Sequence, residues 1–282
     1  LIGLVGSEMC IRDSMIISGT PAIMKVGLGE ILFGTEWMPT AADPKFGILW
    51  VILTSIVGTT LAILLGVPIG VLTAVFLAEV APRPLAAIVK PAVELLAGIP
   101  SVIYGLLGIY LLNPLMYKLE RLIFQGSTTH QFTGGANLLS AVIVLAIMIL
   151  PSIIKVSVTA LEAVPPEYED ASLALGATPV ETYFRVSVPA ARSGIAAAVV
   201  LGVGRAIGEA MAVMMVSGNV PNMPGLFQSV RFLTTAVASE MSYSGGLQRQ
   251  ALFSIALVLF LFIMLINATL NFFLKRNKEG KG

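Results

Sequence analysis

The chain has few of the side chains that carry covalent, redox or metal chemistry. It contains one cysteine, Cys10, and one histidine, His130. A single cysteine excludes a disulfide framework, and a single histidine gives no metal-ligand spacing. No segment matches the GxxxxGK(S/T) loop that holds a nucleotide phosphate. We therefore expect no catalytic residue, no metal site and no cofactor, and we do not expect the chain itself to hydrolyse ATP.

Charge is also scarce. Charged residues make up 12% of the chain and hydrophobic residues 56%, whereas soluble domains carry about 25% charged residues. Several apolar runs exceed the roughly 20 residues that cross a bilayer, and they lack the alternation of an outer-membrane barrel. The net charge of +1 gives no indication of a nucleic acid partner. The sequence thus predicts an all-α polytopic membrane protein in contact with lipid.

Five complete spans are predicted, at about 47–78, 95–115, 136–160, 190–216 and 250–274. An apolar stretch before Pro21 would make about six, with the first one truncated. Gly98 and Pro100 are expected to break or kink the helix that contains them. Lys and Arg favour the cytoplasmic side of a membrane. Four of them follow the last span, which places the C-terminus in the cytoplasm: Lys275, Arg276, Lys278 and Lys281.

The first residues do not fit a membrane segment. Glu8, Arg12 and Asp13 interrupt an apolar flank, and each charge near the centre of a membrane helix costs a few kcal/mol. Written as codons, residues 4–14 resemble a translated transposase-type sequencing adapter. We therefore expect 1–14 to be a non-native segment, to be set aside like a fusion scar, and 15–282 to form the transmembrane domain.

The outer connection at residues 125–135 is polar and glycine-rich, which predicts a flexible loop. It contains His130. With no carboxylate or second histidine beside it in the sequence, His130 is expected to be solvated rather than a ligand.

A segment of nearly 30 residues, about 161–189, separates two apolar spans. Pro166 can open a helix, and Gly176 is placed to end it in a left-handed conformation. Thr178 and Glu181 form the pattern of a capping box that starts a second short helix. A connecting loop is one interpretation. A docking surface is favoured, because a simple connection needs only a few residues.

The segment 161–189 also carries a recognisable pattern. Asp170-Ala171-Ser172, Gly176 and Val186-x-Val188-Pro189 follow the spacing EAA-x3-G-x9-I-x-LP, and so resemble the EAA motif of ABC importer permeases. The resemblance implies a MetI-like importer permease fold. It also implies that five residues couple the chain to a cleft on a cytoplasmic ATPase subunit: Asp170, Ala171, Ser172, Gly176 and Pro189. Asp170 stands where the family usually has Glu, and Ser172 where it often has Ala.

The span 190–216 holds Arg205 and Glu209 among apolar residues. Their separation of four predicts that they share one helix face, about one turn apart. Ionisable groups inside a bilayer are costly and by default functional, and a planar guanidinium suits a tetrahedral oxyanion. A structural ion pair between helices is the alternative. Small residues nearby, at Gly204 with Gly208 and at Gly194, Ala198 and Gly202, would allow neighbouring helices to approach closely.

Residues 204–209 read GRAIGE, and MAV and SGN follow at 211–213 and 217–219. This run resembles the GRA(L/I)GETMAV…GN signature of PstC-type phosphate ABC transporter permeases, with Ala210 in place of the usual Thr. The resemblance implies uptake of inorganic phosphate across the inner membrane of a prokaryote, past Arg205 and Glu209. It also implies three kinds of partner: a PstA-like second permease, two copies of a PstB-like ATP-binding subunit, and a PstS-like phosphate-binding protein outside the membrane.

The sequence leaves other functions open. Arg205 alone does not distinguish phosphate from another oxyanion such as sulfate or molybdate. A secondary anion transporter or channel would need no ATPase, and the long insert at 161–189 argues against it. An intramembrane enzyme would need a nucleophile, a metal or an acid-base cluster, for which the sequence offers no candidate.

Overall fold

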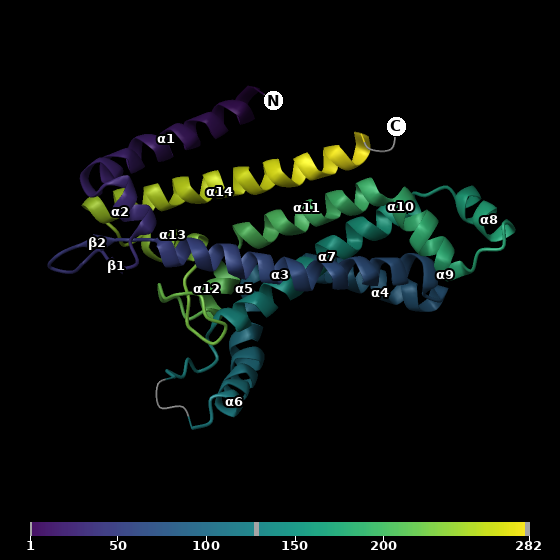
Figure 1. Ribbon diagram of the computed structural model, residues 1–282, viewed down its shortest axis with the longest axis horizontal. Helices are drawn as coiled ribbons and strands as arrows, with labels where there is room; N and C mark the ends of the chain where they lie inside the picture. Colours follow the sequence, from purple (N-terminus) through teal and green to yellow (C-terminus); the bar gives the residue numbers. More distant parts are fainter. Residues whose placement is uncertain (1, 127–129, 280–282) are drawn as a thin grey trace. The chain divides into compact units, whose positions relative to one another are not determined.

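The computed structural model describes residues 2–126 and 130–279, and helices make up most of it (Figure 1). Trp37 pairs with Phe46 across one short antiparallel hairpin. The elements in chain order are α1 (Ile2–Val26), α2 (Leu28–Phe33), β1 (Trp37–Met38), β2 (Lys45–Phe46), α3 (Leu49–Val75), the π-helical η1 (Phe76–Val80), α4 (Arg83–Ala97), α5 (Ser101–Leu107), the π-helical η2 (Gly108–Leu112), α6 (Asn113–Ile123), α7 (Leu138–Glu162), α8 (Pro166–Ala174), α9 (Pro179–Thr182), the π-helical η3 (Tyr183–Ser187), α10 (Val188–Ala190), α11 (Arg192–Gly208), α12 (Met211–Val216), α13 (Leu233–Glu240) and α14 (Gly246–Glu279).

Within the described ranges, four helical stretches are long and apolar enough to cross a membrane, or up to five if a bent pair counts as one span. The four are Leu49–Val80, Ser101–Ile123, Leu138–Glu162 and Gly246–Thr269. They agree with four of the five complete spans that the sequence predicts. The second begins later than expected, because residues up to Ala97 belong to α4 and the helix is interrupted at 98–100. The apolar stretch before Pro21 lies in α1, which is not among these candidates.

The expectation of one continuous helix over 190–216 is wrong. The helix α11 ends at Gly208, and α12 starts at Met211. In an unbroken helix the amide of Ala212 would donate to the carbonyl of Gly208. Instead it donates to Oε1 of Glu209 at 2.9 Å. The Glu209 carbonyl accepts a hydrogen bond from Oγ1 of Thr234 at 2.8 Å. The Ala212 amide and the Glu209 carbonyl are therefore both hydrogen-bonded, but not to the backbone partners that a continuous helix would provide.

The chain divides into two compact units. Unit 1 consists of Leu1–Gly58, Val102–Val144 and Ile207–Leu265. Its core includes Ile31, Ile48, Leu233, Leu252 and Ile255, all at most 1% exposed. These residues come from α2, from the position just before α3, and from α13 and α14, so the short N-terminal elements are fixed against the helices near the end of the chain.

Unit 2 consists of Thr59–Ser101, Leu145–Ala206 and Ile266–Gly282. Its helices approach closely because glycines face large side chains. A Cβ atom at Gly66 of α3 would lie 2.7 Å from Ile149 of α7, and one at Gly202 of α11 would lie 2.7 Å from Ile153. A Cβ at Gly194 would also meet Ala160. Of the small residues predicted at 194, 198 and 202, Gly194 and Gly202 therefore pack α11 against α7, as expected for small residues between membrane helices.

Candidate functional site

Arg205 lies half-buried near the end of α11, in unit 2. Its Nη1 donates a hydrogen bond to Oγ of Ser152 on α7 at 3.0 Å. Among the described residues of unit 2, this neutral hydroxyl is the polar partner of the guanidinium. The positive charge is therefore held in place by α7 without being neutralised there. Ser152 was not among the predicted site residues, although a serine in the middle of an apolar span could have indicated a polar partner for Arg205.

Glu209 lies in unit 1, in the break that precedes α12. Its carboxylate accepts the hydrogen bond from the second amide of α12, which satisfies one of the donors left free at a helix start. The structure therefore gives Glu209 a local capping role that the sequence did not predict. The prediction that Arg205 and Glu209 share one helix face is wrong, because α11 ends before Glu209.

The insert at 161–189 has the predicted local shape. The helix α8 begins at Pro166 and is followed by Gly176 at φ +90°. The amide of Gly176 donates to the carbonyl of Leu173 at 3.0 Å, and the amide of Ala177 donates to the carbonyl of Ser172 at 3.3 Å. This pair of hydrogen bonds is a Schellman motif, which uses a left-handed residue to end a helix. The predicted left-handed end is confirmed.

The predicted capping box is also confirmed. The amide of Glu181 donates to Oγ1 of Thr178 at 3.4 Å, and the amide of Thr178 donates to Oε2 of Glu181 at 3.2 Å. Hydrogen bonds from the backbone and side chain of Thr178, with a smaller effect of Arg185, lower the pKa of Glu181. Glu181 therefore stays charged, and α9 starts in a fixed direction after the turn.

The coupling residues expected from the EAA resemblance occupy different environments. Asp170, Ala171, Gly176 and Pro189 are exposed, whereas Ser172 is half-buried. The hydroxyls of Ser172 and Thr182 lie 2.9 Å apart. Ser172 thus fixes α8 to α9, and the exposed residues form the outer surface. Large apolar side chains on this surface are also exposed: Tyr168, Leu173, Leu175, Val180 and Phe184.

The expectation that His130 is solvated is wrong. Its side chain is 12% exposed, and Nε2 lies 2.8 Å from Oε1 of the buried Glu120. The ring stacks on Phe124 with centroids 3.8 Å apart. The part of the loop at 127–129 lies outside the described residues. The carboxylate was missed because it belongs to the preceding helix α6, onto which the loop folds back.

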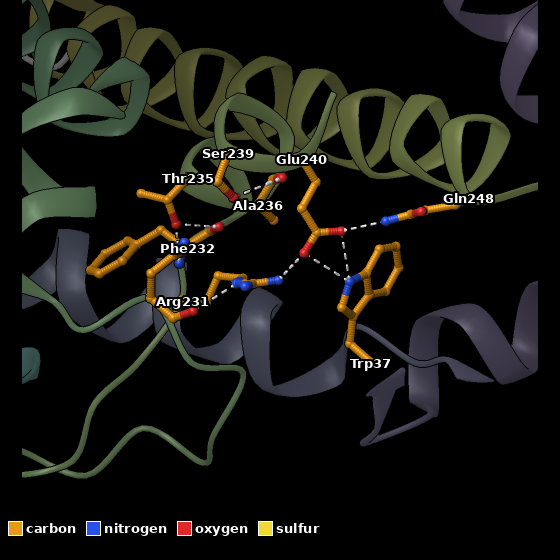
Figure 2. A network of polar contacts seen from close by, with 9 residues as sticks. Trp37, Arg231, Phe232, Thr235, Ala236, Ser239, Glu240 and Gln248 are labelled. Atoms are coloured by element: carbon orange, nitrogen blue, oxygen red, sulfur yellow. Dashed lines mark hydrogen bonds and ion pairs between the residues drawn. The ribbon is translucent and has the colours of Figure 1, made fainter. Parts of the chain in front are cut away.

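A second polar cluster in unit 1 surrounds Glu240 of α13 (Figure 2). Its carboxylate accepts hydrogen bonds from Nε1 of Trp37 at 3.1 and 3.2 Å, from Nη1 of Arg231 at 2.5 Å and from Nε2 of Gln248 at 3.0 Å. Nε of Arg231 donates to the carbonyl of Asn219 at 3.0 Å. One carboxylate therefore joins the N-terminal hairpin, α13, α14 and the loop after α12. No sequence pattern indicated this convergence. Among the described residues, no group of three His, Cys, Asp or Glu side chains is placed to hold a metal ion.

Residues 66–279 match the family model described as "Binding-protein-dependent transport system inner membrane component". The "Probable ABC transporter permease protein YqgH" of Bacillus subtilis is 38% identical, over 93% of this chain and 85% of that protein. The "Phosphate transport system permease protein PstC" of Haemophilus influenzae is 33% identical, over 95% and 88%. The protein of the same name from Mesorhizobium japonicum is 37% identical, over 88% and 78%.

Solved structures show a similar fold at low identity. An inward-facing structure of the MetNI methionine ABC transporter aligns with a TM-score of 0.58 and 19% identity, over 81% of this chain and 95% of that one. A second crystal form of the same transporter aligns with a TM-score of 0.54. The predicted MetI-like fold is therefore confirmed. At this identity the likeness concerns the fold alone.

Proposed function

Since the chain belongs to the family of binding-protein-dependent transport system inner membrane components, and is thus a non-catalytic, multi-pass inner-membrane permease subunit of an ABC importer, we propose that its substrate is inorganic phosphate. Relatives named as phosphate permeases are 33% and 37% identical to it. The relative from Bacillus subtilis carries no substrate in its name. Family membership removes a secondary transporter from consideration. Permeation of sulfate or molybdate is the competing proposal.

The environment of Arg205 is the observation that supports this proposal. Its guanidinium lies half-buried on an apolar helix, with a serine hydroxyl as its partner within unit 2. A charge in a membrane helix is costly unless a counter-ion or water accompanies it. A transported oxyanion supplies the missing negative charge during passage, and the guanidinium offers a planar fork of donors at any physiological pH. Glu209 contributes indirectly in this proposal, since it fixes the start of α12 beyond the break.

An ABC importer permease works with ATPase subunits and a binding protein. We propose here a PstA-like second permease, two copies of a PstB-like ATPase and a PstS-like binding protein, with the C-terminus of the chain in the cytoplasm. The insert at 161–189 would dock on the ATPase through α8. Exposed apolar side chains and the exposed Asp170 support this role. Movement of the ATPases would then tilt α7 and α11, which flank the insert, and alternate access to Arg205.

Docking is tested by cross-linking. Cysteines introduced singly at Ala171 or Ala174, in a Cys10→Ser background, should capture the ATPase in the assembled complex. A cysteine at Ser157, which is buried in α7, provides the control and should not react. Absence of capture at both α8 positions would refute the docking role.

Substrate and Arg205 are tested together in proteoliposomes that contain the chain and its three kinds of partner. ATP-dependent uptake of labelled phosphate, in excess over sulfate and molybdate, is expected. Arg205→Gln should abolish uptake with normal assembly, and Arg205→Lys should weaken it, because it keeps the charge but loses the planar fork. Arg192→Gln is the matched control, since Arg192 is exposed at the other end of α11. Near-normal uptake by the double variant Arg205→Gln with Glu209→Gln would refute the role in the anion pathway.

A further inference from the structure

The helix α7 has one exposed polar stripe in unit 2. Ser152, Lys155, Thr159 and Glu162 follow each other at intervals of three, four and three residues, so they lie along one helix face. Ser152 is half-buried and the other three are exposed. The neighbouring residues Ile153, Ile154, Val158 and Leu161 are buried. The stripe begins at the hydroxyl that holds Arg205 and extends to the end of α7, where the insert begins.

The stripe forms ion pairs with α4 through two lysines, one on each helix. Nζ of Lys155 lies 3.1 Å from Oε1 of Glu94 on α4. Nζ of Lys90, four residues before Glu94 on α4, lies 2.5 Å from Oε1 of Glu162. All four charged residues line one cavity of about 110 Å³, whose apolar walls include Val93 and Val158. That volume is several times the space that one water molecule needs.

Lys155 is unusual for a residue of an apolar span. Its side chain is 53% exposed, and that of Glu94 is 56% exposed. Exposed ion pairs of this kind add little stability and exchange partners easily. A lysine within a membrane helix faces a wet route or a partner subunit rather than lipid. It also lies one turn beyond Ser152, about 4.5 Å further along the axis at 1.5 Å per residue.

We propose that Lys155, supported by Lys90, forms a second cationic station for the transported oxyanion on the way from Arg205 to the end of α7. The station rests on the proposed function, since it needs a tetrahedral oxyanion as cargo. Without an anion, Glu94 forms an ion pair with Lys155, and Glu162 forms one with Lys90. An arriving anion takes the place of Glu94 on Lys155, and the ammonium donates hydrogen bonds to its oxygens. The anion then moves toward Lys90, near the insert that responds to the ATPase.

If Lys155 binds the transported anion, substitutions of Lys155 and of Glu94 should affect phosphate uptake differently. Lys155→Met should lower phosphate uptake about tenfold or more at unchanged assembly, since a hydrogen bond to a charged group is lost. Lys155→Arg should keep most of the uptake. Glu94→Gln removes only a competitor of the anion, so uptake should stay normal or rise. The exchange Lys155→Glu with Glu94→Lys restores an ion pair but puts a negative charge on α7, so uptake should remain impaired.

A structural ion pair predicts the opposite pattern: Glu94→Gln would be as impaired as Lys155→Met, and the exchange would restore uptake. Lys45→Met is the matched control, because Lys45 forms an ion pair with Glu36 at 2.5 Å with similarly exposed side chains, 54% and 51%. All variants are measured in the reconstituted complex, as uptake per assembled complex. Normal uptake by Lys155→Met, or rescue by the exchange, overturns the station while phosphate uptake by the unmodified complex still stands. Failure of the unmodified complex to take up phosphate, sulfate or molybdate rejects the proposed function, and the station with it.

Discussion

Gly176 offers a direct test of how the insert obtains its shape. Its φ of +90° is one that side chains rarely adopt, and a Cβ atom placed there would meet nothing within 4 Å. Substitution therefore changes the backbone preference without adding a clash. A residue other than glycine costs roughly 1–2 kcal/mol in a left-handed conformation, which corresponds to a factor of about 5–30 in the equilibrium between closed and open turn. Asparagine tolerates this conformation better than alanine or valine.

The measurement is amide hydrogen exchange of Ala177, whose N–H donates to the Ser172 carbonyl. Exchange should accelerate by about 5–30-fold in Gly176→Ala, more in Gly176→Val, and least in Gly176→Asn. In the assembled complex the same order should appear as ATP hydrolysed per phosphate taken up. Gly29→Ala is the control, since Gly29 lies in α2 without a positive φ and also has open space around it. Equal exchange in the asparagine and valine variants would refute the reasoning.

Further predictions concern the remaining polar contacts and the start of the chain. Glu240→Ala leaves Arg231, Trp37 and Gln248 without their shared acceptor, so we expect a loss of about 2–4 kcal/mol, slightly less than the roughly 3–5 kcal/mol for a fully buried pair, because Glu240 is 20% exposed. Thermal unfolding in detergent measures the loss, and an unchanged midpoint would contradict the bridging role. Glu209→Ala should cost about 1 kcal/mol through the lost cap, whereas Glu209→Gln keeps an acceptor; similar unfolding of the two variants would exclude capping. Because folding lowers the pKa of Glu181, its stabilising effect is fully present above the ordinary glutamate pKa of about 4.3 and is lost as the pH falls from there through the lowered pKa of the folded state. Exchange of the Thr178 and Glu181 amides that stays constant from pH 6 to about pH 3, after correction for intrinsic rates, would contradict this. Resequencing the genomic locus should show that 1–14 is not encoded in the native gene, and an uninterrupted reading frame for these residues would defeat that expectation.

The sequence alone determined the features that depend on neighbours along the chain. Long apolar runs predicted the spans, because a bilayer sets their length. Pro166, Gly176 and Thr178 predicted where the short helices of the insert begin and end, since their effects reach only a few residues. Each of these signals is local, and the structure agrees with them in the insert and in four of the five predicted complete spans.

Tertiary structure decided what depends on residues far apart in the sequence. At the break after Gly208, the Glu209 carbonyl accepts a hydrogen bond from Thr234, which lies 25 residues after Glu209, and helical spacing in the sequence does not predict that contact. The buried environment of His130 depends on a loop folding back onto α6. The pairing of Lys155 with Glu94 joins two helices whose separation in the chain gives no hint of contact. A periodic pattern can identify an exposed polar face, but only packing determines which charges meet on it.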